Sequence, residues 1–209
     1  ISKLAASDIS YAEKFGYRIK LLGVTKRTPE GIELRVHPTL IPEHQLIANV
    51  NGVMNAVMIK GDAVGSTLYY GAGAGSEPTG SSVVADLIDV TRLHTADPEH
   101  RVPHLAFQPN ALENIPVLPL SAVQTRYYLR LTVKDQKGVL ADVTRILADL
   151  NISVDAMLQT EVDDARKEAQ IVVMTHICKE AEVDAACQQI MALNSVTGDV
   201  VKLRVEELN

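Results

Sequence analysis

The first 75 residues alternate apolar and polar side chains in short runs, which is the period-two pattern of half-buried strands. Residues 17–26 and 32–37 flank the turn Arg27-Thr28-Pro29-Glu30-Gly31, in which proline presets φ and glycine accepts a positive φ. Residues 55–60 and 66–70 alternate in the same way around a second turn that contains two glycines. The pattern therefore predicts at least four antiparallel strands, arranged as two hairpins.

Two helices frame these strands. Asp8 is a candidate cap for a short helix that ends at Gly16, since aspartate accepts hydrogen bonds from free amides and glycine tolerates a left-handed turn. After Gly75 the period changes from 2 to 3.6, which predicts a second helix directly behind a glycine-rich loop. The apolar face of this helix carries Val83, Val84, Leu87, Ile88 and either Val90 or Thr91.

The last third of the chain has the element order βαββαβ. Strands are expected at residues 127–133, 152–160, 169–177 and 200–205, with amphipathic helices at residues 139–150 and 180–193. Two such helices can cover one face of a four-stranded sheet, which gives a ferredoxin-like layer architecture. The fold class expected for the whole chain is α+β.

Five prolines interrupt the region between these parts, and each removes a backbone donor and restricts the residue before it. Because apolar residues are interspersed among them, we expect an extended strap packed along a domain surface. The expected domains are therefore residues 1–95 and 125–209, joined by a linker at residues 96–124.

Composition narrows the function classes. Hydrophobic residues make up 46% of the chain and charged residues 22%, as in globular proteins, and the net charge is −6 without any Lys/Arg run. These values exclude nucleic acid and an anionic membrane as expected partners. No apolar run of about 18 residues or secretion signal occurs, so the expected location is the cytoplasm. Because residue 1 is Ile, we expect a partial chain.

Cysteines and histidines are not spaced for a metal site. Cys178 and Cys187 are too few for a disulfide framework and too far apart for a CxxC pair, so both are expected to be buried thiols. His94, His100 and His104 fall close together, but a proline-rich linker provides no fixed ligand geometry. We expect no metal ligands in this chain.

The stretch YGAGAGSEPTGSSVVADL, residues 70–87, is the most distinctive sequence. It lacks the third glycine and the ribose-binding acid of a dinucleotide fingerprint, and also the Gly-Lys-Ser/Thr of a phosphate-binding loop. Together with GYRIKLLGVTKR and ELRVHPTLIPEHQLIANVNGVMNAVMIKGDAVG, it resembles the end of the catalytic and dimerisation domain of homoserine dehydrogenases. The resemblance covers about residues 1–95. It implies a position beside an NAD or NADP nicotinamide for Gly71, Ala72, Gly73 and Gly75.

The same resemblance implies what this chain lacks. The family's acid/base and substrate-binding Lys, Asp and Glu, and its nucleotide-binding domain, lie upstream of residue 1. No catalytic residue is therefore assigned here. We expect the chain alone to be inactive, because general acid/base catalysis needs its proton carrier within hydrogen-bond reach, and to bind no cofactor tightly.

Residues 128–142, YLRLTVKDQKGVLAD, resemble the start of an ACT domain, an amino-acid sensor of biosynthetic enzymes. The free backbone amides of the helix that follows Gly138 could bind the carboxylate of an amino acid, and Asp135 could pair with its ammonium group. The alternative is that Asp135 only caps this helix. The resemblance implies threonine as effector at an interface between ACT domains, completed by a partner's strand. The expected regulatory ligand residues are Asp135, Gly138, Val139, Leu140, Asp155, Ala156 and Met157.

Three functions fit these observations. The first is part of a homoserine dehydrogenase, which interconverts aspartate 4-semialdehyde and homoserine in threonine and methionine biosynthesis, with amino-acid feedback. The second is a freestanding amino-acid-sensing ACT protein without catalysis. The third treats residues 1–95 as an oligomerisation platform. The first and third predict a homo-oligomer, a dimer or larger.

Overall fold

The computed structural model describes residues 4–95, 107–159 and 167–208, which form two compact units. One unit combines Ile1–Ala48 with Pro116–Asn209, and the other comprises Asn49–Ile115. Both contain helices and antiparallel strands, so the α+β prediction is confirmed. These bounds differ from the expected domains: the first hairpin lies in the same unit as the βαββαβ region, and the division at residues 95 and 125 stays a prediction.

The first unit begins with helix α1 (Ala6–Lys14) and a long hairpin of β1 (Tyr17–Thr28) and β2 (Gly31–Pro42). A 3₁₀ turn, η1 (Leu46–Asn49), follows. The hairpin prediction is confirmed, and Gly16 has the expected left-handed φ of 78°. Asp8 accepts an amide hydrogen bond at the helix start as expected, but from inside the helix: Ala5 is the N-cap, and the carboxylate of Asp8, three residues later, accepts a bond of 2.8 Å from Ala5 N.

The predicted βαββαβ order is confirmed. It comprises β5 (Gln124–Lys134), α3 (Val139–Asp149), β6 (Val154–Gln159), β7 (Glu168–Thr175), α4 (Glu180–Met191) and β9 (Val201–Val205). A two-residue strand, β8 (Cys178–Lys179), additionally pairs with the start of β5. The four main strands lie in the order β9-β5-β7-β6, all antiparallel, as a ferredoxin-like sheet requires.

The hairpin extends this sheet, so that the strand order is β1-β2-β9-β5-β7-β6. The connection is a parallel pairing of β2 with β9 through only two residue pairs, Thr39 with Arg204 and Leu40 with Val205. Glu206 N continues it with a hydrogen bond of 3.0 Å to Leu40 O. The first hairpin and the predicted ACT region therefore share one continuous sheet.

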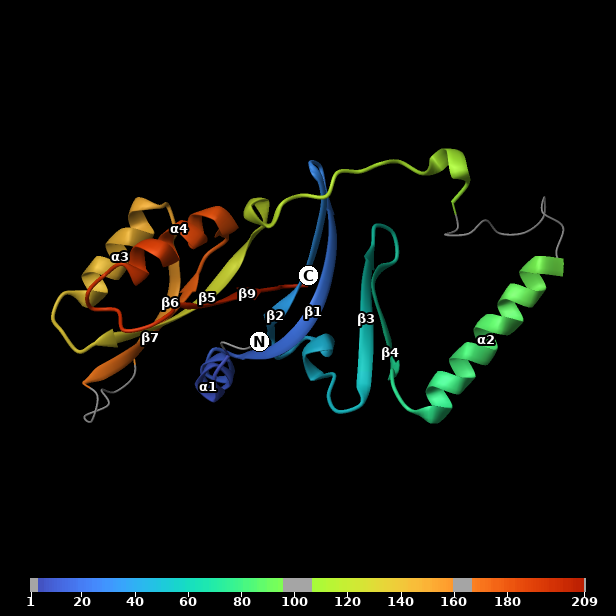
Figure 1. Ribbon diagram of the computed structural model, residues 1–209, viewed down its shortest axis with the longest axis horizontal. Helices are drawn as coiled ribbons and strands as arrows, with labels where there is room; N and C mark the ends of the chain where they lie inside the picture. Colours follow the sequence, from blue (N-terminus) through green and yellow to red (C-terminus); the bar gives the residue numbers. More distant parts are fainter. Residues whose placement is uncertain (1–3, 96–106, 160–166, 209) are drawn as a thin grey trace. The chain divides into compact units, whose positions relative to one another are not determined.

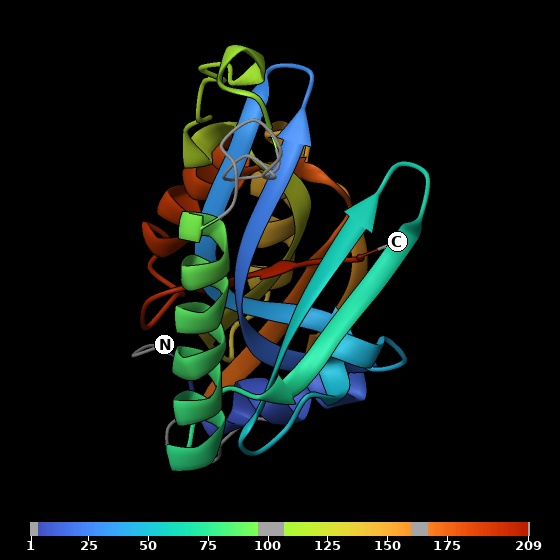
Figure 2. The same cartoon turned by 90° about the vertical axis from the view of Figure 1, so that its right-hand side faces the viewer.

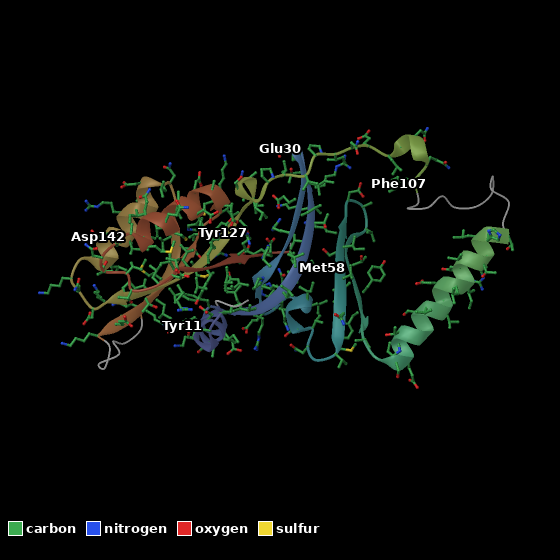
Figure 3. The ribbon with its side chains drawn as sticks, viewed as in Figure 1. Tyr11, Glu30, Met58, Phe107, Tyr127 and Asp142 are labelled. Carbon is green, nitrogen blue, oxygen red and sulfur yellow. The ribbon has the colours of Figure 1, made fainter. Side chains whose placement is uncertain are left out.

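Hydrophobic cores lie on both faces of this sheet. Helices α3 and α4 cover one face, and α1 lies on the other (Figure 1). Figure 3 marks Tyr127 on the α4 side and Tyr11 on α1. Neighbouring side chains of β5 point to opposite faces: Tyr127 belongs to the core under α3 and α4, and Tyr128 belongs to the core on the α1 side. Both are fully buried. The strand is thus buried on both faces like the central strand of a covered sheet, although its α1 face combines Tyr128 with the buried charged residue Arg130.

Part of the expected strap lies within the described residues. Its segment Pro116–Leu118 runs beside the start of β2: Ile32 N donates to Pro116 O at 2.9 Å, and Leu118 N donates to Ile32 O at 2.8 Å. The 3₁₀ turn η4 (Leu120–Ala122) then leads into β5. Packing of the strap along a domain surface is confirmed for this segment, whereas residues 96–106 lie outside the described ones.

The second unit contains the hairpin of β3 (Met54–Gly61) and β4 (Gly65–Ala72), helix α2 (Ser76–Thr95) and the 3₁₀ turn η3 (Pro109–Ala111). Figure 2 shows α2 as one unbroken helix. None of its residues is buried, including the apolar face predicted from the sequence. Within the described residues, no helix combines the length and hydrophobicity that a membrane span needs.

One face of β2 buries polar side chains in place of apolar ones. Glu33, Arg35, His37 and Thr39 are all buried, whereas Leu34 and Val36, which point the other way, are 50% and 75% exposed. Arg35 forms ion pairs with Glu33 and with Glu206 of the C-terminal segment. Burial, together with the positive charges of Arg204 and Arg35, lowers the pKa of His37 to about 4.

We expect Gly31→Ala to destabilise the first unit by about 1–3 kcal/mol, because a Cβ at this position would overlap Pro116 O and the glycine has a φ of 154°. Gly23→Ala on β1 is the matched control, since its Cβ would meet nothing closer than Val36 Cγ2 at 3.9 Å. Urea unfolding of both variants measures the difference. Equal stability would contradict the close packing of the strap.

Stability should depend on His37 between about pH 6.5 and 4. The folded state holds the imidazole neutral down to a pKa of about 4, while the unfolded chain takes up the proton near 6.5. Stability is therefore complete above pH 6.5 and falls, by at most about 3 kcal/mol, as the pH drops through this window. His37→Gln should reduce the change of the urea unfolding midpoint between pH 6.5 and 4.5. The control His44→Gln, at an exposed position, should leave this pH dependence unchanged.

Candidate functional site

The glycine-rich loop connects β4 to α2 in the second unit. Gly71 and Ala72 end β4, where they pair with Asn55 and Met54 of β3. Gly73 and Gly75 follow immediately before the helix. All four predicted cofactor residues are exposed and lie on one continuous turn. Gly75 has a φ of 129°, which side chains rarely adopt, so at this position the turn requires glycine.

The second predicted site follows β5. Asp135 is exposed, and its backbone N donates a hydrogen bond of 3.0 Å to Lys167 O. Gly138 is the N-cap of α3 with a left-handed φ of 95°, and no side chain caps this helix. Asp135 is therefore not the helix cap, and its carboxylate has no hydrogen-bond partner among the described residues. Val139 is buried and Leu140 exposed, so the first turn of α3 presents uncapped amides beside a free carboxylate.

The three predicted residues of β6 do not form one surface. A β-bulge lies between Val154 and Ala156, so that Asp155 leaves the regular alternation. Ala156 packs with the core on the α1 side, and Met157 packs with the core under α3 and α4. The carboxylate of Asp155 pairs with Arg126, and His176 Nε2 lies 3.8 Å away.

A single chain does not bring the two halves of this predicted site together. Asp155 contacts Arg126 near the start of β5, whereas Asp135 follows the end of the same strand. Asp135 lies nine positions after Arg126, which corresponds to about 30 Å in an extended strand. A ligand that contacts both regions therefore requires a second copy of the chain.

Arg126 organises a polar cluster that was not predicted from the sequence. Its guanidinium pairs with Asp155 and with Glu207, and it donates to Tyr17 Oη at 3.1 Å and to Thr175 O at 3.3 Å. Burial alone would lower the pKa of Arg126, but the hydrogen bond with Glu207 and the surrounding charges raise it. A pocket of about 330 Å³ adjoins this cluster, and none of the predicted site residues lines it. Its lining is Phe15, Gly16, Tyr17, Pro42, His44, Gln45 and Glu207.

A second cluster that was not predicted joins α1 to the sheet. Asp8, which is fully buried, accepts hydrogen bonds from Arg130 Nε at 2.5 Å and Nη2 at 3.0 Å, and from Tyr128 Oη at 2.7 Å. Burial would raise the pKa of Asp8, but these bonds and that from Ala5 N outweigh it and hold the pKa below its ordinary value. The carboxylate is therefore ionised at neutral pH.

A third cluster surrounds Glu180 at the start of α4. Its carboxylate accepts bonds of 2.7 and 2.6 Å from Arg204, one of 2.8 Å from Tyr127 Oη, and one from Lys202. Burial raises the pKa of Glu180 less than these hydrogen bonds lower it. Arg204, Lys202 and Tyr127 thus converge on one buried carboxylate, and Lys202 also pairs with Asp184 of α4, so the cluster stabilises the packing of α4 on the sheet.

The remaining predictions concern thiols and metals. Cys178 and Cys187 are buried free thiols as expected, and burial raises the pKa of Cys187 to about 11. The described residues contain no group of His, Cys, Asp and Glu arranged for a metal ion. Of the three neighbouring histidines, His94 lies in α2, and His100 and His104 lie outside the described residues.

Comparison with known proteins gives two family matches. The sequence model of the homoserine dehydrogenase family matches residues 1–88, and that of the ACT domain matches residues 127–194. Similar proteins named homoserine dehydrogenase include one from Pseudomonas aeruginosa, 57% identical, and one from Neisseria gonorrhoeae, 53% identical. Each aligns with 100% of this chain, which covers 48% of either relative.

A solved structure agrees with these matches. The crystal structure of a homoserine dehydrogenase from Thiobacillus denitrificans is 62% identical, with a TM-score of 0.90 over 100% of this chain and 47% of that one. The chain thus spans about half the length of the relatives that it matches. Because the matches include both family regions, a freestanding ACT protein is not favoured. Residues 1–88 thus match the homoserine dehydrogenase family, residues 127–194 match the ACT domain, and the whole chain is similar to part of the proteins named homoserine dehydrogenase.

Proposed function

We propose that the protein containing this chain is a homoserine dehydrogenase, which interconverts aspartate 4-semialdehyde and homoserine with NAD or NADP. The observation that carries the proposal is the continuity of the match, since relatives of that name align with all 209 residues. This chain supplies a hairpin, the glycine-rich turn and a regulatory domain. The groups that move protons and bind the nucleotide belong to the other half, so the chain alone is inactive.

The glycine-rich turn is the part of this chain proposed to approach the cofactor. Gly71, Ala72, Gly73 and Gly75 form an exposed turn directly before α2, and small residues allow a ligand to approach the backbone closely. The apolar face of α2 is also exposed, with Val84 at 55% and Leu87 at 62%. A face of this kind fits coverage by the remaining half of the enzyme.

The ACT domain is proposed to bind threonine as a feedback effector at an interface between two chains of a homo-oligomer. The uncapped first turn of α3 suits the carboxylate of an amino acid, and Asp135 suits its ammonium group. Asp155, Ala156 and Met157 of a partner's β6 complete the site in this proposal. Asp155 contributes through its backbone and position, because its carboxylate is already paired with Arg126. We expect the enzyme to act in the cytoplasm.

The role of the glycine-rich turn is tested by Gly75→Ala in the full-length enzyme. A side chain at φ 129° strains the turn, so we expect homoserine-dependent reduction of NAD or NADP to fall about tenfold or more in kcat/KM. Gly80→Ala in α2 is the control, because a Cβ there has open space. Unchanged kinetics in Gly75→Ala would show that the turn is not part of the cofactor site. Separately, turnover by the 209-residue chain alone would contradict the assignment of the chemistry to the other half of the enzyme.

Calorimetry with threonine tests the effector site. Asp135→Ala should weaken binding by about 1.5–3 kcal/mol, roughly 10- to 150-fold, because a charge-assisted hydrogen bond is lost. Gly138→Val should weaken it at least as much, since valine disfavours the observed φ of 95°. Asp149→Ala removes the same charge from the exposed far end of α3 and should have no effect. Absence of binding to the unchanged chain at millimolar threonine would exclude this effector.

A further inference from the structure

The buried contact between α1 and the ACT sheet joins two functionally different parts of the chain. Asp8 lies in the region matched by the homoserine dehydrogenase family, and Arg130 lies in the region matched by the ACT domain. Their side chains form a two-pronged ion pair in which Asp8 is fully buried and the Arg130 side chain is 10% exposed. Exposed ion pairs contribute little to stability. Removal of one partner of a buried pair, in contrast, leaves the other charge buried without a partner, which is costly.

Two hydroxyl groups extend the contact over neighbouring strands. Tyr128 Oη of β5 donates to Asp8 Oδ1 at 2.7 Å. Tyr11 Oη of α1 donates to Gln170 Oε1 of β7 at 2.8 Å. Around these polar contacts lies the second core, in which Tyr11 and Ala12 of α1 pack against the sheet. Its strand residues are Leu40, Tyr128, Val172, Met174, Val201, Leu203 and Val205. The helix is therefore fixed in position and rotation by charge, hydrogen bonds and apolar packing.

Strands β5 and β7 lead from α1 to the effector loop. β5 carries Tyr128 and Arg130 on its α1 face and ends at Lys134, directly before Asp135. Gln170 of β7 is paired with Thr132, two residues before that end, and Lys167, just before β7, accepts the hydrogen bond from Asp135 N. From Arg130 to Asp135 the strand spans about 17 Å. The loop and α1 thus contact the same two paired strands.

We propose that docking of α1 on the ACT sheet and binding of the effector are thermodynamically coupled, and that the pair of Asp8 with Arg130 carries this coupling into the dehydrogenase region. The inference rests on the proposed function. Effector binding orders the loop and the ends of β5 and β7, and docked α1 holds the same strands. Each event therefore lowers the ordering cost of the other, and linkage makes the effect reciprocal.

Reciprocity allows a test with the 209-residue chain and threonine as the probe. Asp8→Asn keeps the size of the side chain but leaves Arg130 without its charge partner, so we expect threonine affinity to fall at least about fivefold. Tyr11→Phe removes only the hydroxyl bond to Gln170 and should lower affinity in the same direction but less; it covers the case in which Asp8→Asn does not fold. Glu13→Gln is the control, because Glu13 lies on α1 in an exposed ion pair with Arg18.

Hydrogen exchange supplies a readout independent of affinity. Threonine should slow exchange at the amides of residues 9–14 in the unchanged chain and in Glu13→Gln, but less in Tyr11→Phe. If the unchanged chain binds threonine while Tyr11→Phe and Asp8→Asn bind equally well and α1 exchange does not respond, the coupling is wrong and the effector site stands. If the unchanged chain binds no threonine, the effector assignment fails and the coupling fails with it.

Discussion

The parallel contact between β2 and β9 is the constraint on which the first unit depends, because it makes the dehydrogenase hairpin and the ACT strands one sheet. Two residue pairs are too few to hold a 12-residue strand in register by backbone bonds alone. A buried ion pair spans the contact instead: Arg35 of β2 binds Glu206 just beyond β9. Because these groups find their partners only in this register of β2 against β9, they make the short pairing of the two strands specific.

The positions of the strands and helices in this unit could be predicted from the sequence, but which face of each strand is buried could not. Period-two alternation in β2 is satisfied equally by burial of Leu34 and Val36 or by burial of Glu33, Arg35 and His37, and transfer energies favour the first. The structure has the second arrangement, because the partners of Arg35 come from β2 itself and from Glu206, 171 residues away. Local patterns contain no information on such distant partners. The charged Arg130, which lies between Leu129 and Leu131 of β5, was the available signal that this unit buries charged groups.

The candidate site residues also fall into two groups: those set by neighbouring residues in the sequence, and those that depend on distant partners. The loop at Asp135 and Gly138 was predictable, since glycine with positive φ and an uncapped helix start follow from neighbouring residues. The β6 residues were not, because the bulge at Asp155 places Ala156 on the face opposite to Val154, and Arg126 pairs with the carboxylate of Asp155. A bulge depends on the register with β7, which no local pattern specifies.

The packing of the ACT sheet limits how a second chain can contribute to an effector site. Helices α3 and α4 cover one face, α1 covers the other, and the hairpin occupies the edge at β9. Among the described strands, β6 is left at the opposite edge of the ACT sheet, with backbone groups free to pair. A partner that completes a site with the loop at Asp135 would therefore approach along β6. Helix α1, which lies on the second face, is in the region matched by the homoserine dehydrogenase family, so this region limits how a partner can approach the ACT sheet.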